Sequence, residues 1–208
     1  ISTFLLIQSL RYIAQLSAYP YNPYNFTFVS RQEWGALPST DDRPLLTPVQ
    51  YVVIHHTYIP AACYDRKTCM EAMKAMQQYH NSLEWGDIGY NFCIGSDGAV
   101  YEGRSWYIKG IHAGKANGVS IGICLIGDWR VDLPPQNQLN TTKDLITAGI
   151  KLGYIKDDYK LVGHKQIMDT ECPGEALLTE IKTWEHYSAL GPNDPLKTLR
   201  QTVKVNRS

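Results

Sequence analysis

No excess of charge of either sign marks this 208-residue chain, in which Lys plus Arg and Asp plus Glu both number 20. Such a chain lacks the long-range attraction that draws proteins to nucleic acids and anionic membrane surfaces, so we expect neither as a partner. Arg11 interrupts the apolar start of the chain, whereas a membrane-spanning helix needs about 20 apolar residues. We therefore expect no membrane span. The length fits one domain of ~150–200 residues with its own core.

The two ends of the chain differ in composition from its middle. Residues 1–18 begin with Ile1 and are mostly apolar, which fits a truncated secretory signal with Leu16-Ser17-Ala18 as a poor cleavage site. Arg11 counts against that interpretation, and an ordinary N-terminal helix is the alternative. We expect a leader or extended segment over 1–27, one domain over 28–190, and a polar tail over 191–208 that is mobile.

Apolar periodicity and turn signals predict strands that alternate with helices. Asp97-Gly98 is a hairpin signal between two of the strands, and Thr68 with Glu71 fits a capping box at the start of a helix. The segment 31–48 holds three prolines and is expected to be irregular. The predicted class is α/β, with a central, mostly buried mixed sheet flanked by about three α-helices. The expected strands are 51–56, 90–94, 99–103, 120–126 and 161–164, and the expected helices are 68–81, 134–152 and 175–187.

The five cysteines fall into three groups. Cys63 and Cys69 lie six residues apart before a helix, and they form a plausible disulfide if the chain is secreted. Two free thiols are the alternative. Cys93 and Cys124 lie inside apolar runs and are expected to be buried. Cys172, beside a proline and a glycine, is the remaining thiol and the one that points to chemistry.

Cys172 is a candidate metal ligand together with histidines from two strands. His164 ends a strand eight residues before Cys172, and His55-His56 ends another strand more than a hundred residues upstream. Neighbouring residues of a strand point to opposite faces, so only one of this pair can join, and the sequence does not decide which. Three ligands would leave the fourth position of a zinc ion open for water, as in catalytic sites. A His and a Cys at this spacing more often bind no metal.

Five motifs, in this order along the chain, resemble the peptidoglycan recognition proteins, which are related to the phage-type zinc amidases. The likeness covers roughly residues 28–190 and is strongest to the amidase-active LB-type branch of insects. It implies an amidase_2-like zinc fold. The motifs are Tyr51-Val-Val-Ile-His-His-Thr, Trp85-Gly-Asp-Ile-Gly-Tyr-Asn-Phe, Asp97-Gly-Ala-Val-Tyr-Glu-Gly-Arg, Gly122-Ile-Cys-Leu-Ile-Gly-Asp and Gly163-His with Cys172-Pro-Gly.

The resemblance implies a zinc-dependent N-acetylmuramoyl-L-alanine amidase. Zn²⁺ would be held by His55, His164 and Cys172, with His56 packed on the other face. The bond cleaved would join the lactyl group of N-acetylmuramic acid to L-alanine. Relatives that only bind the bacterial wall typically lack the cysteine, so a non-catalytic receptor is the alternative function. A structural zinc site would need a fourth protein ligand, and we find no credible one in the sequence.

Two further residues are catalytic candidates by this resemblance. Tyr90 matches the family's catalytic tyrosine, although a strand tyrosine beside glycine is more often a core residue. Thr170 stands where the phage relatives have a lysine, two residues before Cys172. A threonine hydroxyl cannot act as an acid near neutral pH, so the source of the proton for the leaving amine stays unassigned.

The resemblance also suggests how the wall peptide is bound. Arg104 occupies the position of the arginine that pairs with the extra carboxylate of diaminopimelate, which predicts that wall type. Trp85 matches the family, whereas Glu84 replaces a glycine beside it. Trp106 and His112, with Tyr90, are expected to line the groove. We expect a secreted monomer that degrades peptidoglycan fragments and so dampens innate immune signalling.

Overall fold

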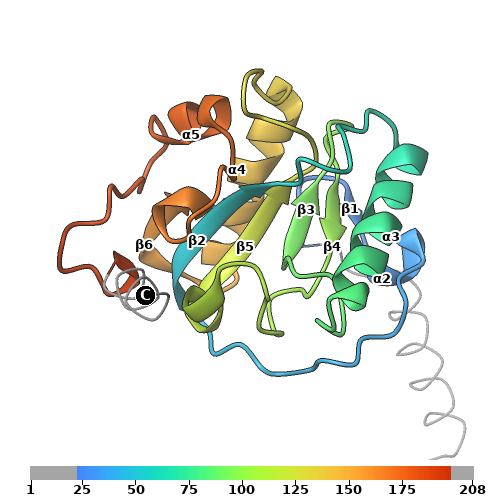
Figure 1. The fold of residues 1–208 in the computed structure, drawn as a ribbon, viewed down its shortest axis with the longest axis horizontal. Coiled ribbons are helices and arrows are strands. Elements are labelled where there is room, and N and C mark those ends of the chain that lie inside the picture. Colours follow the sequence, from blue (N-terminus) through green and yellow to red (C-terminus); the bar gives the residue numbers. More distant parts are fainter. Residues whose placement is uncertain (1–22, 198–208) are drawn as a thin grey trace, which may run out of the picture.

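A six-stranded mixed sheet organises residues 23–197, the part of the chain that this computed structural model describes (Figure 1). The strand order is β1-β4-β3-β5-β2-β6. β3 and β4 form the antiparallel hairpin that Asp97-Gly98 predicts, and the other neighbours are parallel. The mixed α/β prediction is confirmed. The strands are Phe28–Val29 (β1), Val49–His56 (β2), Phe92–Ile94 (β3), Val100–Glu102 (β4), Ser120–Leu125 (β5) and Ile155–Gly163 (β6).

Helices cover both faces of this sheet. The α-helices within residues 23–197 are Arg31–Trp34 (α2), Arg66–Ser82 (α3), Gln136–Lys151 (α4) and Glu175–Ile181 (α5). α4 lies behind the sheet in Figure 1, and α3 lies beside the β3–β4 hairpin. α4 buries Leu139, Leu145 and Ile146 on one side, because apolar residues at helical spacing form a stripe that faces the core.

The alternation of side chains along β2 divides the core into two sides. Val52 and Ile54 belong to the cluster shared with α4 and α5. Tyr51 and Val53 point to the opposite face, where they pack with residues 113–116 and with the chain after α5. Successive strand residues alternate between the faces, so His55 shares the side of Val53. The strand thereby carries a histidine to the end of the sheet without interrupting the apolar core.

Several element boundaries differ from the sequence prediction. The N-cap of α3 is Asp65, whose side chain accepts a hydrogen bond from the Thr68 backbone N–H at 2.9 Å, so Thr68 is not the cap. Part of the segment expected to be irregular, 31–48, forms α2, where Ser30 and Glu33 make a capping box. β6 begins six residues before the expected strand, and α5 ends at Ile181, short of the expected 187.

The first residues of the tail expected to be mobile, 191–197, are packed against the folded domain. Leu190 and Leu196 are buried against Tyr51 and Val53. Asp194 accepts hydrogen bonds from the Tyr51 hydroxyl at 3.1 Å and from the Lys160 ammonium at 2.5 Å. Residues 191–197 are therefore part of the folded body. Residues 1–22 of the leader expected over 1–27, and residues 198–208 of the expected tail, lie outside the described residues.

The cysteine predictions agree with the structure. Cys63 and Cys69 are joined by a disulfide bond, which fixes the loop between β2 and α3. Cys93 and Cys124 are free and fully buried on the neighbouring strands β3 and β5. Within residues 23–197, no helix combines the length and the apolar character that a membrane crossing needs.

Candidate metal centre and active-site cavity

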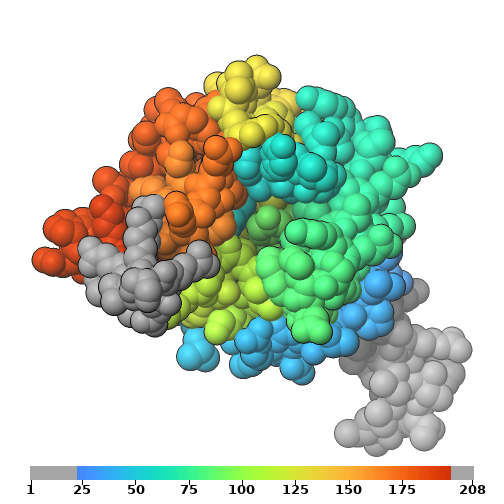
Figure 2. Space-filling model, in the orientation of Figure 1, coloured from blue at the N-terminus to red at the C-terminus, as the bar shows by residue number. Residues whose placement is uncertain are grey.

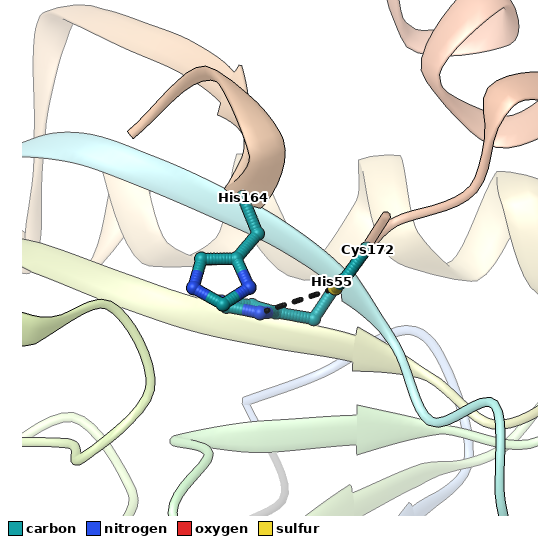
Figure 3. A group of neighbouring side chains, drawn as sticks. All are labelled: His55, His164 and Cys172. Atoms are coloured by element: carbon teal, nitrogen blue, oxygen red, sulfur yellow. Dashed lines mark hydrogen bonds between the residues drawn. The ribbon is translucent and has the colours of Figure 1, made fainter. Parts of the chain in front are cut away.

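Three side chains from distant parts of the chain meet at one edge of the sheet. His55 lies near the end of β2, His164 directly follows β6, and Cys172 lies in the loop before α5 (Figure 3). β2 and β6 are parallel, and Ile54 pairs with Gly163, so the two histidines occupy neighbouring positions at the same edge. One ligand atom from each of the three side chains lies within 4.8 Å of the others.

The loop that carries Cys172 is hydrogen-bonded to the residues that directly follow β6. The Lys165 backbone N–H donates to the Cys172 carbonyl at 2.7 Å, and the Cys172 N–H donates to the Thr170 hydroxyl at 3.2 Å. The Cys172 sulfur is 3.6 Å from His55 Nδ1 and accepts a hydrogen bond from the His56 backbone N–H at 3.4 Å. These bonds bring the sulfur back to the histidines across eight residues of chain.

Burial sets the protonation of all three groups. It lowers the pKa of His164 to about 4 and holds the pKa of His55 well below its usual value, where the neighbouring histidines add to the effect. Both imidazoles are therefore neutral at pH 7, the form in which a ring nitrogen binds a metal. Burial raises the pKa of the Cys172 thiol to about 12. The thiol stays protonated unless a cation compensates the buried charge.

The donor set fits a metal ion. Both ring nitrogens of His164 are buried and have no hydrogen-bond partner among the described residues. Buried polar groups left without a partner are rare because each costs about 1–3 kcal/mol. Two imidazoles and one thiolate are ligands that zinc prefers. An ion held by His55, His164 and Cys172 would give His164 the missing interaction.

His164 and Cys172 line a cavity of about 320 Å³, and His55 is buried beside them. In Figure 2 this cavity is the hollow on the face towards the viewer, between the teal segment that follows β2 and the orange segment near residue 170. The sequence analysis did not assign several of its lining residues to the site, among them Tyr58 and Arg130. The lining residues are His56, Thr57, Tyr58, Tyr90, Arg130, His164, Thr170, Glu171 and Cys172.

Tyr90 and Thr170 both line the cavity. The ring of Tyr90 lies 5.2 Å from the ring of His55, centroid to centroid. Burial, with smaller contributions from nearby thiols, raises the pKa of Tyr90 well above its usual value. The phenol is therefore neutral at physiological pH and can donate its proton in a hydrogen bond. The Thr170 hydroxyl is used locally, as the acceptor for the Cys172 N–H.

The structure places the two histidines at 55 and 56 on different sides of β2. His56 lies at the end of the strand, and its Nδ1 accepts a hydrogen bond from the Trp129 backbone N–H at 3.1 Å. Asp128 lies 3.8 Å from the same nitrogen. His56 is thus held by Trp129 and borders the cavity, whereas the candidate ligand group contains His55.

The residues expected to contact substrate occupy very different environments. Trp85 is half-buried and stacks on His80. The Arg104 side chain is fully buried and paired with Asp41 at 2.7 Å. Trp106 is a core residue, only 2% exposed, that packs on Phe92. Trp106 therefore has almost no exposed surface with which to contact substrate. Arg104 has no free face towards solvent.

His112 is likewise not exposed to the cavity. Its ring is buried and lies edge-on to the ring of His55, with His112 Nδ1 3.0 Å from His55 Nε2. The cavity-lining residues of the described chain do not include it. The sequence identified His112 as part of the site, but the structure places it behind a candidate metal ligand.

Comparison with known proteins identifies the family. A family model described as N-acetylmuramoyl-L-alanine amidase matches residues 45–175. Peptidoglycan-recognition protein LB of Drosophila melanogaster is 47% identical over 177 residues, which are 84% of this chain and 76% of that protein. The chain belongs to the peptidoglycan recognition protein family. A human N-acetylmuramoyl-L-alanine amidase is 39% identical over 173 residues, which are 81% of this chain but only 30% of the human protein.

Solved structures of the peptidoglycan recognition protein family share this fold. Wild-type Drosophila PGRP-LB superposes with a TM-score of 0.78 at 47% identity, covering 79% of this chain and 97% of that one. Peptidoglycan recognition protein LE, solved with tracheal cytotoxin, a monomeric diaminopimelic acid-type peptidoglycan, gives 0.77 at 38% identity and covers 79% and 97%. The fold predicted from the resemblance is therefore confirmed.

Proposed function

We propose that this protein is a zinc-dependent N-acetylmuramoyl-L-alanine amidase. The observation that carries the proposal is the group of His55, His164 and Cys172, in which both nitrogens of His164 lack a partner among the described residues. His164 and Cys172 also line the cavity. Three protein donors are the number found in catalytic zinc sites, whereas structural sites have four. A receptor without chemistry would have no need of a buried thiol at this position.

Zinc bound there would polarise the amide carbonyl and lower the pKa of a water molecule towards ~7. The chain's own residues do the rest. Tyr90 is neutral and borders the cavity, so its hydroxyl can donate a hydrogen bond to the amide oxygen as negative charge develops on it. Removing one such donor typically lowers turnover by about 10²–10³. Thr170 holds the loop of Cys172 through its hydroxyl and does not transfer a proton.

We infer that the substrate is peptidoglycan of the diaminopimelate type, cleaved between the lactyl group and L-alanine. The likeness to proteins solved with tracheal cytotoxin supports this substrate class. The disulfide between Cys63 and Cys69 supports action in an oxidising compartment outside the cell. Removal of immunostimulatory fragments is the physiological role that this activity would serve.

The proposal is tested with purified diaminopimelate-type peptidoglycan. Wild type, Cys172→Ser and the matched control Cys93→Ala are compared for release of free stem peptide and for bound zinc. We expect one zinc and robust release for wild type and control, and loss of both for Cys172→Ser. Binding of peptidoglycan without release by wild type, at full zinc occupancy, would favour the receptor instead.

A further inference from the structure

The hydrogen bond between His112 and His55 has a role that the amidase reaction itself does not assign. We propose that His112 is a positioning residue, which fixes the His55 ring and its tautomer so that Nδ1 is the metal-binding nitrogen. The inference rests on the proposed function, since it concerns the same candidate metal centre. It replaces the expectation that His112 contacts substrate.

The geometry separates the two nitrogens of His55. Nε2 lies 3.0 Å from His112 Nδ1, and the rings are nearly perpendicular, at 89°. Nδ1 lies on the other side of the ring, 3.6 Å from the Cys172 sulfur. Only Nδ1 therefore faces the other candidate ligands, and Nε2 is occupied by the second imidazole. His55 is 1% exposed, so water does not compete for that nitrogen.

Metal binding through Nδ1 of His55 would fix where the protons of the two rings lie. A neutral imidazole carries one N–H, and the nitrogen that binds a metal must present its lone pair. If His55 binds through Nδ1, its proton is on Nε2, which then donates to His112 Nδ1. The opposite assignment, with His112 as the donor, would leave the His55 proton on Nδ1 and block the metal site. His112 must therefore act as the acceptor.

The acceptor is itself held rigidly. The backbone N–H of His112 donates to Asn117 Oδ1 at 3.0 Å. The ring lies over Gly122 of β5, where a Cβ atom would come within 2.6 Å of the ring carbon Cγ. Gly122 pairs with Val53 of β2, two residues before His55. Glycine at 122 thus makes room for the ring directly beside the strand that carries the ligand.

Metal-binding histidines usually donate their second ring N–H to a carboxylate, a carbonyl or water, and loss of that partner typically weakens metal affinity by about 10–100-fold. Here the partner is a second buried imidazole. An acceptor without negative charge adds no net charge to the buried site. It orients the His55 ring and selects its tautomer through one hydrogen bond.

The experiment measures zinc affinity by competition with a chelator, and the absorption spectrum of the cobalt-substituted protein. His112→Leu removes the acceptor at similar volume, whereas His112→Asn keeps an oxygen close to the position of Nδ1. We expect zinc affinity to fall 10–100-fold in His112→Leu, with an altered cobalt spectrum, and to be largely restored in His112→Asn. Equal affinity and identical spectra in wild type and His112→Leu would overturn the positioning role.

Two controls separate this inference from the proposed function. If wild type itself binds no zinc, the amidase proposal fails, whereas unchanged affinity in His112→Leu alone leaves that proposal intact. If His112→Leu does not fold, Gly122→Ala is used instead, because its added methyl displaces the ring without removing it. Reduced zinc affinity in a folded Gly122→Ala protein supports the positioning role, and unchanged affinity contradicts it.

Discussion

The buried His80 predicts a specific loss of stability in acid. His80 is only 7% exposed, its Nδ1 accepts a hydrogen bond from the Gly89 N–H at 3.0 Å, and its ring stacks on Trp85. Burial lowers the pKa of His80 to about 4, and the nearby Arg104 charge acts in the same direction. The hydrogen bond from Gly89 needs an unprotonated Nδ1, and burial disfavours a charged ring, so protonation opposes the packed conformation.

The sign and size of the effect follow from linkage. In the unfolded chain His80 takes up a proton near its ordinary pKa of ~6.5, whereas in the folded protein it does so only near 4. The unfolded state therefore binds more protons between these values, and stability falls as the pH drops through that window. The contribution of His80 to the free energy of unfolding is fully present above pH ~6.5. By pH ~4.5 about 2–3 kcal/mol of it has been lost.

Denaturant unfolding of wild type and His80→Gln, at pH 7.5 and pH 4.5, measures this contribution. Glutamine cannot be protonated, and its side-chain oxygen can still accept from Gly89. We expect the free energy of unfolding to fall by about 2–3 kcal/mol less in the variant than in wild type. The other buried histidines titrate equally in both proteins and cancel in the difference. Equal falls for the two proteins would refute the reasoning.

Three further predictions concern the site and its surroundings. Tyr90→Phe should lower kcat by about 10²–10³ and leave binding of peptidoglycan nearly unchanged, as measured by turnover and by calorimetry. A loss of activity that is accompanied by a large drop in thermal stability would instead assign the tyrosine a structural role. Asp41→Ala should reduce the free energy of unfolding, measured with denaturant, by about 3 kcal/mol, because it leaves the buried Arg104 guanidinium without its carboxylate. A change below ~1 kcal/mol would mean that the backbone carbonyls around Arg104 stabilise its charge without Asp41. Arg130→Ala removes a cation–π contact of 4.5 Å with Tyr58 at the cavity wall, so we expect KM to rise while zinc content stays constant, and an unchanged KM would place substrate elsewhere.

The structure brings together the three side chains that the sequence analysis names as candidate metal ligands, and part of this grouping follows from local rules. Period-two alternation requires that His55 and His56 face opposite sides of a strand, and a histidine at the end of a neighbouring parallel strand reaches the same edge. Which of the two histidines faces the site depends on the side to which α4 packs. From the sequence, only the resemblance indicated His55 as the histidine that joins the group. In the structure Val53 and His55 lie on the face away from α4, and His55 is the one grouped with His164 and Cys172.

Other features depend on contacts that no local pattern contains. Arg104 is buried because Asp41, 63 residues away, supplies a carboxylate. Trp106 donates to the Tyr24 hydroxyl, 82 residues away, so a tryptophan expected to line the groove is a core residue. The prediction for the start of α3 was wrong for a different reason. Asp65 and Thr68 both have side chains able to cap a helix, and the sequence offers no means of choosing between two caps three residues apart.

Enclosure of Arg104 limits what this residue can contribute to the proposed preference for diaminopimelate. Its guanidinium already donates to Asp41 and to the backbone carbonyls of Ile88, Trp85 and Lys109. A ligand carboxylate can reach this group only by replacing Asp41, which exchanges one buried ion pair for another at nearly constant charge. The gain in affinity is then a difference between two similar pairs, and not the full energy of a new one. Discrimination between wall types by Arg104 would therefore be modest.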